Sequence, residues 1–203
     1  KAIIDALLGE GARVLHTLCF PGQVACSSEG ATEYEYDPKK AKQLLKEAGY
    51  PDGFTIDLYV YRERNQIEAI VGLLREIGIK VNLRSTQYGT LRDAARAGNA
   101  GFIQTTWASY SVNDVTAFTP VFFKFGPDDI TRDEKVRDLL EKGDTTIDSK
   151  VRQQAYKEAL QIISKNAYTF PLYSLPVHFV ANKDLRFKVY GDSIPRMWEM
   201  YYE

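Results

Sequence analysis

Uncharged polar and aromatic side chains gather in one stretch of the sequence, residues 97–123, which has the chemistry of a small-molecule pocket. Asp114 is its single charged residue, whereas the average charge density of the chain would place about seven there. An aromatic ring stands near hydroxyl and amide side chains at Trp107, Ser109, Tyr110, Ser111 and Asn113. Flat apolar faces beside a few directional hydrogen-bond groups suit solute binding. The alternative is a buried strand and a loop whose polar groups bond the backbone.

Catalytic and metal-binding motifs are absent from the sequence. It has no Gly-x-Ser-x-Gly, no His-Glu-x-x-His and no phosphate loop ending in Gly-Lys-Ser/Thr. His16 and His178 stand far apart and are expected to be structural or loop residues, and Asp128 and Asp129 to be solvated charges before a helix. We therefore expect no enzyme, no metal site and no cofactor. An enzyme that used Asp114 or His178 would need a base and a nucleophile within hydrogen-bond reach.

Alternating strand and helix patterns predict the elements that position these residues. Residues 54–61, 79–86 and 102–107 are predicted strands, and apolar residues at helical spacing lie between them. This order predicts an α/β fold with a mostly parallel sheet flanked by helices. Ligands of such sheets bind beyond the carboxyl ends of the strands, which adds Arg62 and Tyr88 to the candidate binding residues.

Helix caps and turns predict the rest of the chain. Asp37-Pro38 begins a short helix, Thr131-x-x-Glu134 is a candidate capping box for a helix that ends at Gly143, and Asp148 or Ser149 caps the longest helix. Residues 9–36 are expected to form a long loop. Two weak strands are expected at residues 178–181 and 187–190.

The composition excludes several functional classes. The 203 residues carry 26 Lys and Arg against 27 Asp and Glu, a balance without a broad electrostatic footprint for nucleic acid or an anionic membrane. No stretch suits a membrane span. Cys19 and Cys26 enclose a short loop, so they are a possible disulfide in an oxidising compartment, with two unpaired residues as the alternative. The chain starts inside an apolar helical pattern, which predicts a fragment of a longer protein.

Residues 36–54, which read YDPKKAKQLLKEAGYPDGF, closely resemble the signature of the family 5 extracellular solute-binding proteins, the receptors of peptide and nickel ABC importers. Ile77-Gly78-Ile79-Lys80-Val81, the spacing of Asp148, Arg152 and Tyr156, and Pro171-Leu172-Tyr173 continue the likeness. The resemblance implies a type II periplasmic-binding-protein lobe. Residues 1–174 would form the second, C-terminal lobe, and residues 175–203 would return toward a missing first lobe.

The resemblance also implies a function. A small solute, oligopeptide-like or another polar compound, would be enclosed between two lobes by hinge closure and passed to the membrane subunits of an ABC permease. The protein would be periplasmic or otherwise extracytoplasmic, and free or lipid-anchored. Peptide-binding relatives place an Asp three residues after the Trp that matches Trp107, where it pairs with the ligand's ammonium group, but Tyr110 stands here. A nickel-chelate or sugar-derivative receptor, or a sensor that has lost binding, therefore stays open.

Overall fold

The computed structural model describes residues 2–108, 112–190 and 192–203, and its contacts divide the chain into two compact units. We call Glu33–Thr106 the sheet unit. Ile3–Thr32 and Trp107–Glu203 make up the second, which we call the disulfide unit. The lobe boundary expected after residue 174 stays a prediction. Among the described residues, no helix is long and apolar enough to cross a membrane.

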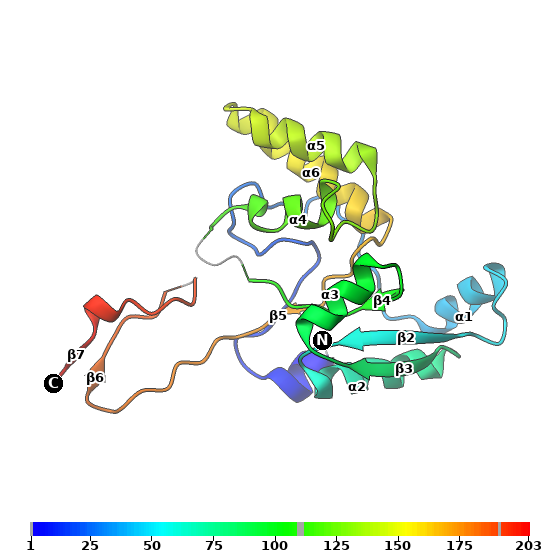
Figure 1. Cartoon of the computed structure of the whole chain (residues 1–203), viewed down its shortest axis with the longest axis horizontal. Helices are drawn as coiled ribbons and strands as arrows, with labels where there is room; N and C mark the ends of the chain where they lie inside the picture. The colour runs from blue at the N-terminus through cyan, green and yellow to red at the C-terminus, as the bar shows by residue number, and fades with distance from the viewer. Residues whose placement is uncertain (1, 109–111, 191) are drawn as a thin grey trace. The chain divides into compact units, whose positions relative to one another are not determined.

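The sheet unit contains three parallel strands in the order β3–β2–β4, which confirms the predicted parallel sheet. Strand β2, Thr55–Val60, lies in the middle, between β3, Lys80–Ser85, and β4, Phe102–Ile103 (Figure 1). Thr55 lies opposite Lys80 and Leu58 opposite Phe102. The third strand is shorter than the predicted 102–107.

Three helices accompany this sheet: α1, Pro38–Glu47, α2, Arg64–Glu76, and α3, Tyr88–Arg96. The Asp37 side chain accepts a hydrogen bond from the Lys40 amide at 2.9 Å, which confirms the predicted start of α1. Ile67 of α2 is buried against Leu58 and Val60 of β2. Burial of these apolar side chains fixes the helix on the sheet.

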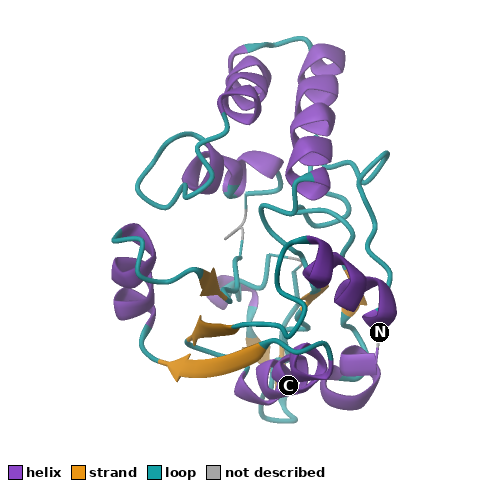
Figure 2. Ribbon diagram, turned by 90° about the vertical axis from the view of Figure 1, so that its right-hand side faces the viewer, coloured by secondary structure: helices purple, strands orange, loops and turns teal. Residues whose placement is uncertain are grey.

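The disulfide unit is built around α5, Glu134–Thr145, and α6, Ser149–Lys165, which lie side by side (Figures 1 and 2). The Asp148 side chain accepts from the Lys150 and Val151 amides, so Asp148 caps α6. Tyr156 and Leu160 of α6 are fully buried with Leu140 of α5. The shorter elements of the unit are η1 (Ile4–Leu8), β1 (Arg13–Val14), η2 (Val115–Ala117), α4 (Thr119–Phe123), β5 (Tyr173–Ser174), β6 (Leu185–Arg186), η3 (Met197–Glu199) and β7 (Tyr201–Tyr202).

The region before α5 differs from its prediction. Asp133, not Thr131, caps the helix, because its side chain accepts from the Val136 amide at 3.0 Å. The Thr131 amide and hydroxyl instead donate to Asp129. Asp129 is 2% exposed rather than solvated, and it also accepts from the Phe125 and Arg132 amides. The carboxylate therefore organises the turn from inside.

The end of α5 and the last strands also differ from their predictions. Helix α5 continues past Gly143 to Thr145. The glycine leaves room for Tyr156, since a Cβ at position 143 would lie 2.8 Å from the Tyr156 ring. Residues 178–181 and 187–190 form no strand. Instead, β6 pairs with β7 in antiparallel fashion, and β1, within the predicted 9–36 loop, pairs with β5.

Candidate functional site

The carboxyl ends of the three parallel strands bring several polar and aromatic side chains together in the sheet unit. Tyr61 follows β2 and Tyr88 follows β3, and their ring centroids lie 5.0 Å apart. The Tyr61 hydroxyl donates to the carbonyl of Thr106, which follows β4, at 3.2 Å. All three strand ends therefore meet at one edge, where open parallel sheets place their ligands.

Glu63 lies at the same edge in a left-handed backbone conformation, with φ of 52°. Its Oε2 accepts from the Thr106 hydroxyl at 3.0 Å and from the Gln104 amide at 3.4 Å. Within the described part of the chain, the buried Oε1 of Gln104 has no hydrogen-bond partner. A strained residue beside an unsatisfied polar atom is more frequent at binding sites than elsewhere.

Arg62 and Tyr88, the residues of the sheet unit that the sequence predicts as ligand-binding, lie at this edge. The Arg62 guanidinium lies 5.4 Å from the Tyr61 ring centroid, and the Arg92 guanidinium lies 5.6 Å from that of Tyr88. Arg62 is exposed, so its charge faces solvent. The prediction missed the side-chain network of Glu63, Gln104 and Thr106. Their positions just after strand ends were the available signal.

Trp107 belongs to the disulfide unit, where two contacts hold its indole. The indole nitrogen donates to the Ala117 carbonyl at 3.2 Å, and the ring meets that of Phe122 edge to face at 5.1 Å. The side chain nevertheless remains 42% exposed. Its hydrogen-bond donor is used internally, while part of its apolar surface is open.

Asp114, the single charged residue of 97–123, is hydrogen-bonded to residues of its own unit. Its Oδ1 accepts from Arg152 at 2.8 Å and from the Thr116 amide at 2.9 Å, which caps η2. Burial acts to raise the pKa of Asp114, but the bonds from Arg152 and Thr116 outweigh it and lower that pKa. Asn113 is exposed and its carbonyl accepts from the Val24 amide. Ser109, Tyr110 and Ser111 lie outside the described residues.

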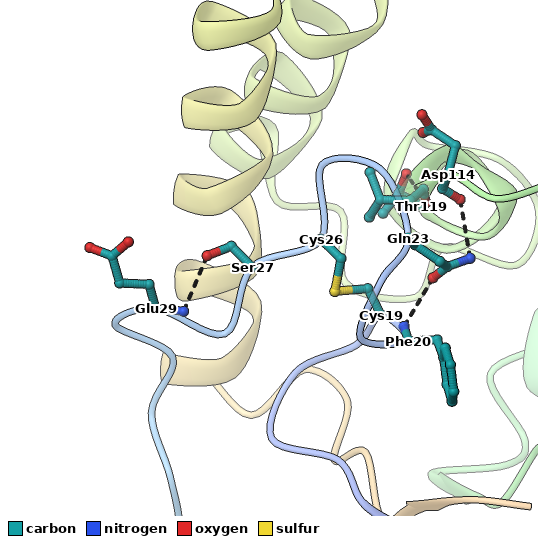
Figure 3. The surroundings of a disulfide bond; sticks show 9 residues. Cys19, Phe20, Gln23, Cys26, Ser27, Glu29, Asp114 and Thr119 are labelled. Carbon is teal, nitrogen blue, oxygen red and sulfur yellow. Dashed lines mark hydrogen bonds between the residues drawn. A yellow bond between two sulfur atoms is a disulfide. The ribbon is translucent and has the colours of Figure 1, made fainter.

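A disulfide joins Cys19 to Cys26 and supports the backbone of this segment (Figure 3). Val24, inside the disulfide loop, forms a parallel bridge with Asp114. The Gln23 amide donates to the Asp114 carbonyl at 3.3 Å, and its Oε1 accepts from the Phe20 amide at 2.9 Å (Figure 3). The short closed loop thus holds a segment that lies about 90 residues later in the sequence.

No group of three His, Cys, Asp or Glu side chains that would hold a metal ion is found in the described ranges. The candidate residues of the two units offer aromatic faces, amide and hydroxyl groups, and the exposed guanidinium of Arg62. Each unit carries its own part of the predicted set.

Comparison with known proteins decides the family. Residues 1–129, more than half of the chain, match the family model described as "Bacterial extracellular solute-binding proteins, family 5 Middle". The chain belongs to family 5 of the bacterial extracellular solute-binding proteins. The resemblance seen in residues 36–54 is thereby confirmed.

Named members of family 5 bind chemically different solutes. Heme-binding protein A of Haemophilus influenzae is 26% identical over 85% of this chain and 34% of its own length. The dipeptide-binding protein of Escherichia coli is 26% identical over 82% of this chain and 33% of its own length. The glutathione-binding protein GsiB of Salmonella choleraesuis is 29% identical over 68% of this chain and 30% of its own length. The chain spans about a third of these curated relatives.

Solved structures share the fold of this chain. HbpA2 of Haemophilus parasuis superimposes with a TM-score of 0.79 at 23% identity, covering all of this chain and 42% of that one. A dipeptide-binding protein of Pseudoalteromonas sp. SM9913, solved with Met-Leu, gives 0.78 at 21% identity with the same coverage. The fold is that of a type II periplasmic binding protein, as the resemblance implies.

Proposed function

We propose that this chain forms part of the extracytoplasmic solute-binding component of an ABC importer, which captures a small polar solute, oligopeptide-like or otherwise. The observation that carries the proposal is the family match over residues 1–129. The rest of the polypeptide would supply the other lobe, and closure of the two lobes would present the loaded receptor to the permease. The protein would work outside the cytoplasm, free or lipid-anchored.

Trp107 is the proposed stacking surface for the solute. Because Ala117 already accepts from its indole nitrogen, the side chain offers its ring rather than a hydrogen-bond donor. A ring surface tolerates different solutes, which agrees with relatives named for haem, dipeptides and glutathione. Asn113 and the undescribed Ser109, Tyr110 and Ser111 would supply directional hydrogen bonds.

The edge of the sheet unit is the second proposed contact surface. Tyr88 offers an aromatic face, and the exposed Arg62 offers a cation for an anionic group of the solute. These roles apply whether the solute is a peptide, a nickel chelate or a sugar derivative. The solute's identity therefore has to be measured.

Calorimetry of the full-length protein tests the proposal. The probes are Met-Leu, reduced glutathione, haemin, a nickel–histidine chelate and a disaccharide, and native mass spectrometry examines which solute co-purifies. Trp107→Ala is expected to weaken the bound probe about tenfold or more, since a lost aromatic contact is worth about 1.4 kcal/mol. Trp198→Ala is the matched control, because Trp198 is an 80% exposed tryptophan outside the proposed site.

Two outcomes separate the parts of this proposal. Unchanged affinity in Trp107→Ala would remove Trp107 from the site but leave the receptor function intact. Absence of any co-purified solute together with no binding of any probe would contradict the receptor function itself.

A further inference from the structure

Arg152, in the first half of α6, is held between a buried ring and a carboxylate. Its guanidinium carbon lies 4.9 Å from the ring centroid of Tyr156, which is fully buried and whose hydroxyl donates to Asp144. Its Nη2 donates to Asp114 at 2.8 Å, and the two side chains are only 20% and 23% exposed. The guanidinium is thus fixed on one side by the helix core and on the other by Asp114.

Asp114 transmits this position to η2. The same Oδ1 that accepts from Arg152 also accepts from the Thr116 amide, which starts the three-residue helix. An N-cap carboxylate that is held by a cation keeps one rotamer, whereas a free one exchanges between several. The Asp114 backbone is held separately by Gln23 and Val24. Arg152 therefore governs the side chain of Asp114, and the disulfide loop governs its backbone.

The last residue of η2 reaches Trp107. Ala117 ends the short helix, and its carbonyl accepts from the indole nitrogen at 3.2 Å. The indole ring also meets the ring of Phe122 in α4 edge to face. The indole therefore depends on a carbonyl whose own position depends on the cap at Asp114.

We infer that Arg152 is a positioning residue for Trp107, acting through Asp114 and η2 without touching the solute. The inference rests on the proposed function for its effect on binding, but its structural part is independent of any solute. It also assigns Asp114 an internal role. A cationic group of a solute would have to displace Arg152 before it could pair with that carboxylate.

Fluorescence tests the structural part directly, because the chain has only two tryptophans. In full-length protein with Trp198→Phe and with any tryptophans outside this chain replaced by Phe, Trp107 is the single reporter. Arg152→Met is expected to raise the acrylamide quenching constant of Trp107 about twofold, since a released indole is more accessible. Arg152→Lys, which keeps the charge, should restore most of the original value. Asp114→Asn keeps a capping oxygen but removes the ion pair, so it should shift quenching in the same direction by less.

Arg137→Met is the matched control. Arg137 also pairs with an aspartate, Asp138, and also lies over an aromatic ring, that of Phe125 at 4.6 Å. Within the described ranges, Arg137 makes no hydrogen bond, ion pair or ring contact with η2 or Trp107. Quenching in this variant should equal that of the parent protein.

Binding of the probe that the parent protein takes up tests the functional part. Arg152→Met is expected to lower the affinity for this probe about tenfold, which is the free energy of one charge-assisted hydrogen bond. Arg152→Lys should recover most of this loss. Unchanged quenching in both Arg152→Met and Asp114→Asn, with native circular dichroism, would overturn the inference. If Arg152→Met fails to fold, Asp114→Asn and Arg152→Lys carry the same comparison. Altered quenching with unaltered affinity would keep the positioning role and contradict only the proposed role of Trp107 in binding.

Discussion

The two units position their candidate binding residues in different ways. In the sheet unit, Tyr61, Tyr88 and Thr106 meet because the parallel register of β2, β3 and β4 brings three strand ends to one edge. In the disulfide unit, Trp107 is held by a series of hydrogen bonds, each involving a side chain, that runs through the backbone of η2 and through Asp114 to Arg152.

This difference predicts different sensitivities. A backbone ladder distributes its hydrogen bonds over many residues, so a single side-chain change at the strand ends should have little effect on the others. A chain of side-chain contacts depends on each member in turn, so one substitution should release the whole segment. The following substitutions test that contrast from the largest expected effect to the smallest.

Gly53→Ala should break the sheet unit. Gly53 has φ of +75°, and a Cβ there would lie 2.0 Å from the carbonyl oxygen of Gly78, two residues before β3. Strain and backbone collision together are expected to lower the free energy of unfolding by about 3 kcal/mol or more. Hydrogen exchange of the sheet-unit amides in the full-length protein measures this loss.

Gly72→Ala is the control for that substitution. Gly72 lies in the middle of α2 with nothing within 4 Å of its added Cβ, so the change should stabilise by about 0.5 kcal/mol through helix propensity. Similar hydrogen-exchange rates in Gly53→Ala and in the parent protein would show that the stability of the sheet unit does not depend on the close approach of Gly53 to Gly78.

The Cys19→Ser, Cys26→Ser double variant should loosen the disulfide unit. The lost cross-link closes a loop with a sequence separation of 7, and its removal is expected to cost about 2.5 kcal/mol. Because Val24 and Gln23 hold Asp114, quenching of Trp107 in the single-tryptophan background should rise as well. Sheet-unit hydrogen exchange should stay near the parent rates.

Reductant provides the control. When the parent protein is reduced, its Trp107 quenching should approach that of the double variant. Reductant should not change the quenching of the double variant. A disulfide loss that leaves Trp107 quenching unchanged would contradict the support that the loop gives to this segment.

The same contrast explains what could be predicted from sequence. In the sheet unit, the predicted strand 54–61 is found at Thr55–Val60, and the Asp37 cap is found as predicted, because periodicity and capping are local signals. In the disulfide unit, the predicted capping box of α5 is wrong, and so is the prediction that Asp129 is solvated. Its four hydrogen bonds depend on how residues 125–132 fold back on themselves.

The candidate site divides in a similar way. Its residue types were predictable, since an aromatic ring with few charges around it is visible in the sequence at Trp107. The hydrogen-bond partners of these residues were not predictable. Asp114 pairs with Arg152 across 38 positions, and Thr106 donates to Glu63 across 43, and no local pattern encodes such partners. The roles of Trp107, Arg62 and Tyr88 in binding remain predictions.

Tyr61→Phe should produce the smallest effect and sharpens the comparison most. It removes the hydroxyl that donates to the Thr106 carbonyl but keeps the ring that faces Tyr88. If the strand register positions this edge, the loss should be about 0.5–1 kcal/mol, the net worth of one hydrogen bond, and probe affinity should change less than twofold. Tyr59→Phe is the matched control, because the described residues show no hydrogen bond to the Tyr59 hydroxyl. A loss of affinity in Tyr61→Phe as large as that expected for Arg152→Met would mean that the sheet edge, too, depends on individual side-chain contacts, and the contrast between the two units would fail.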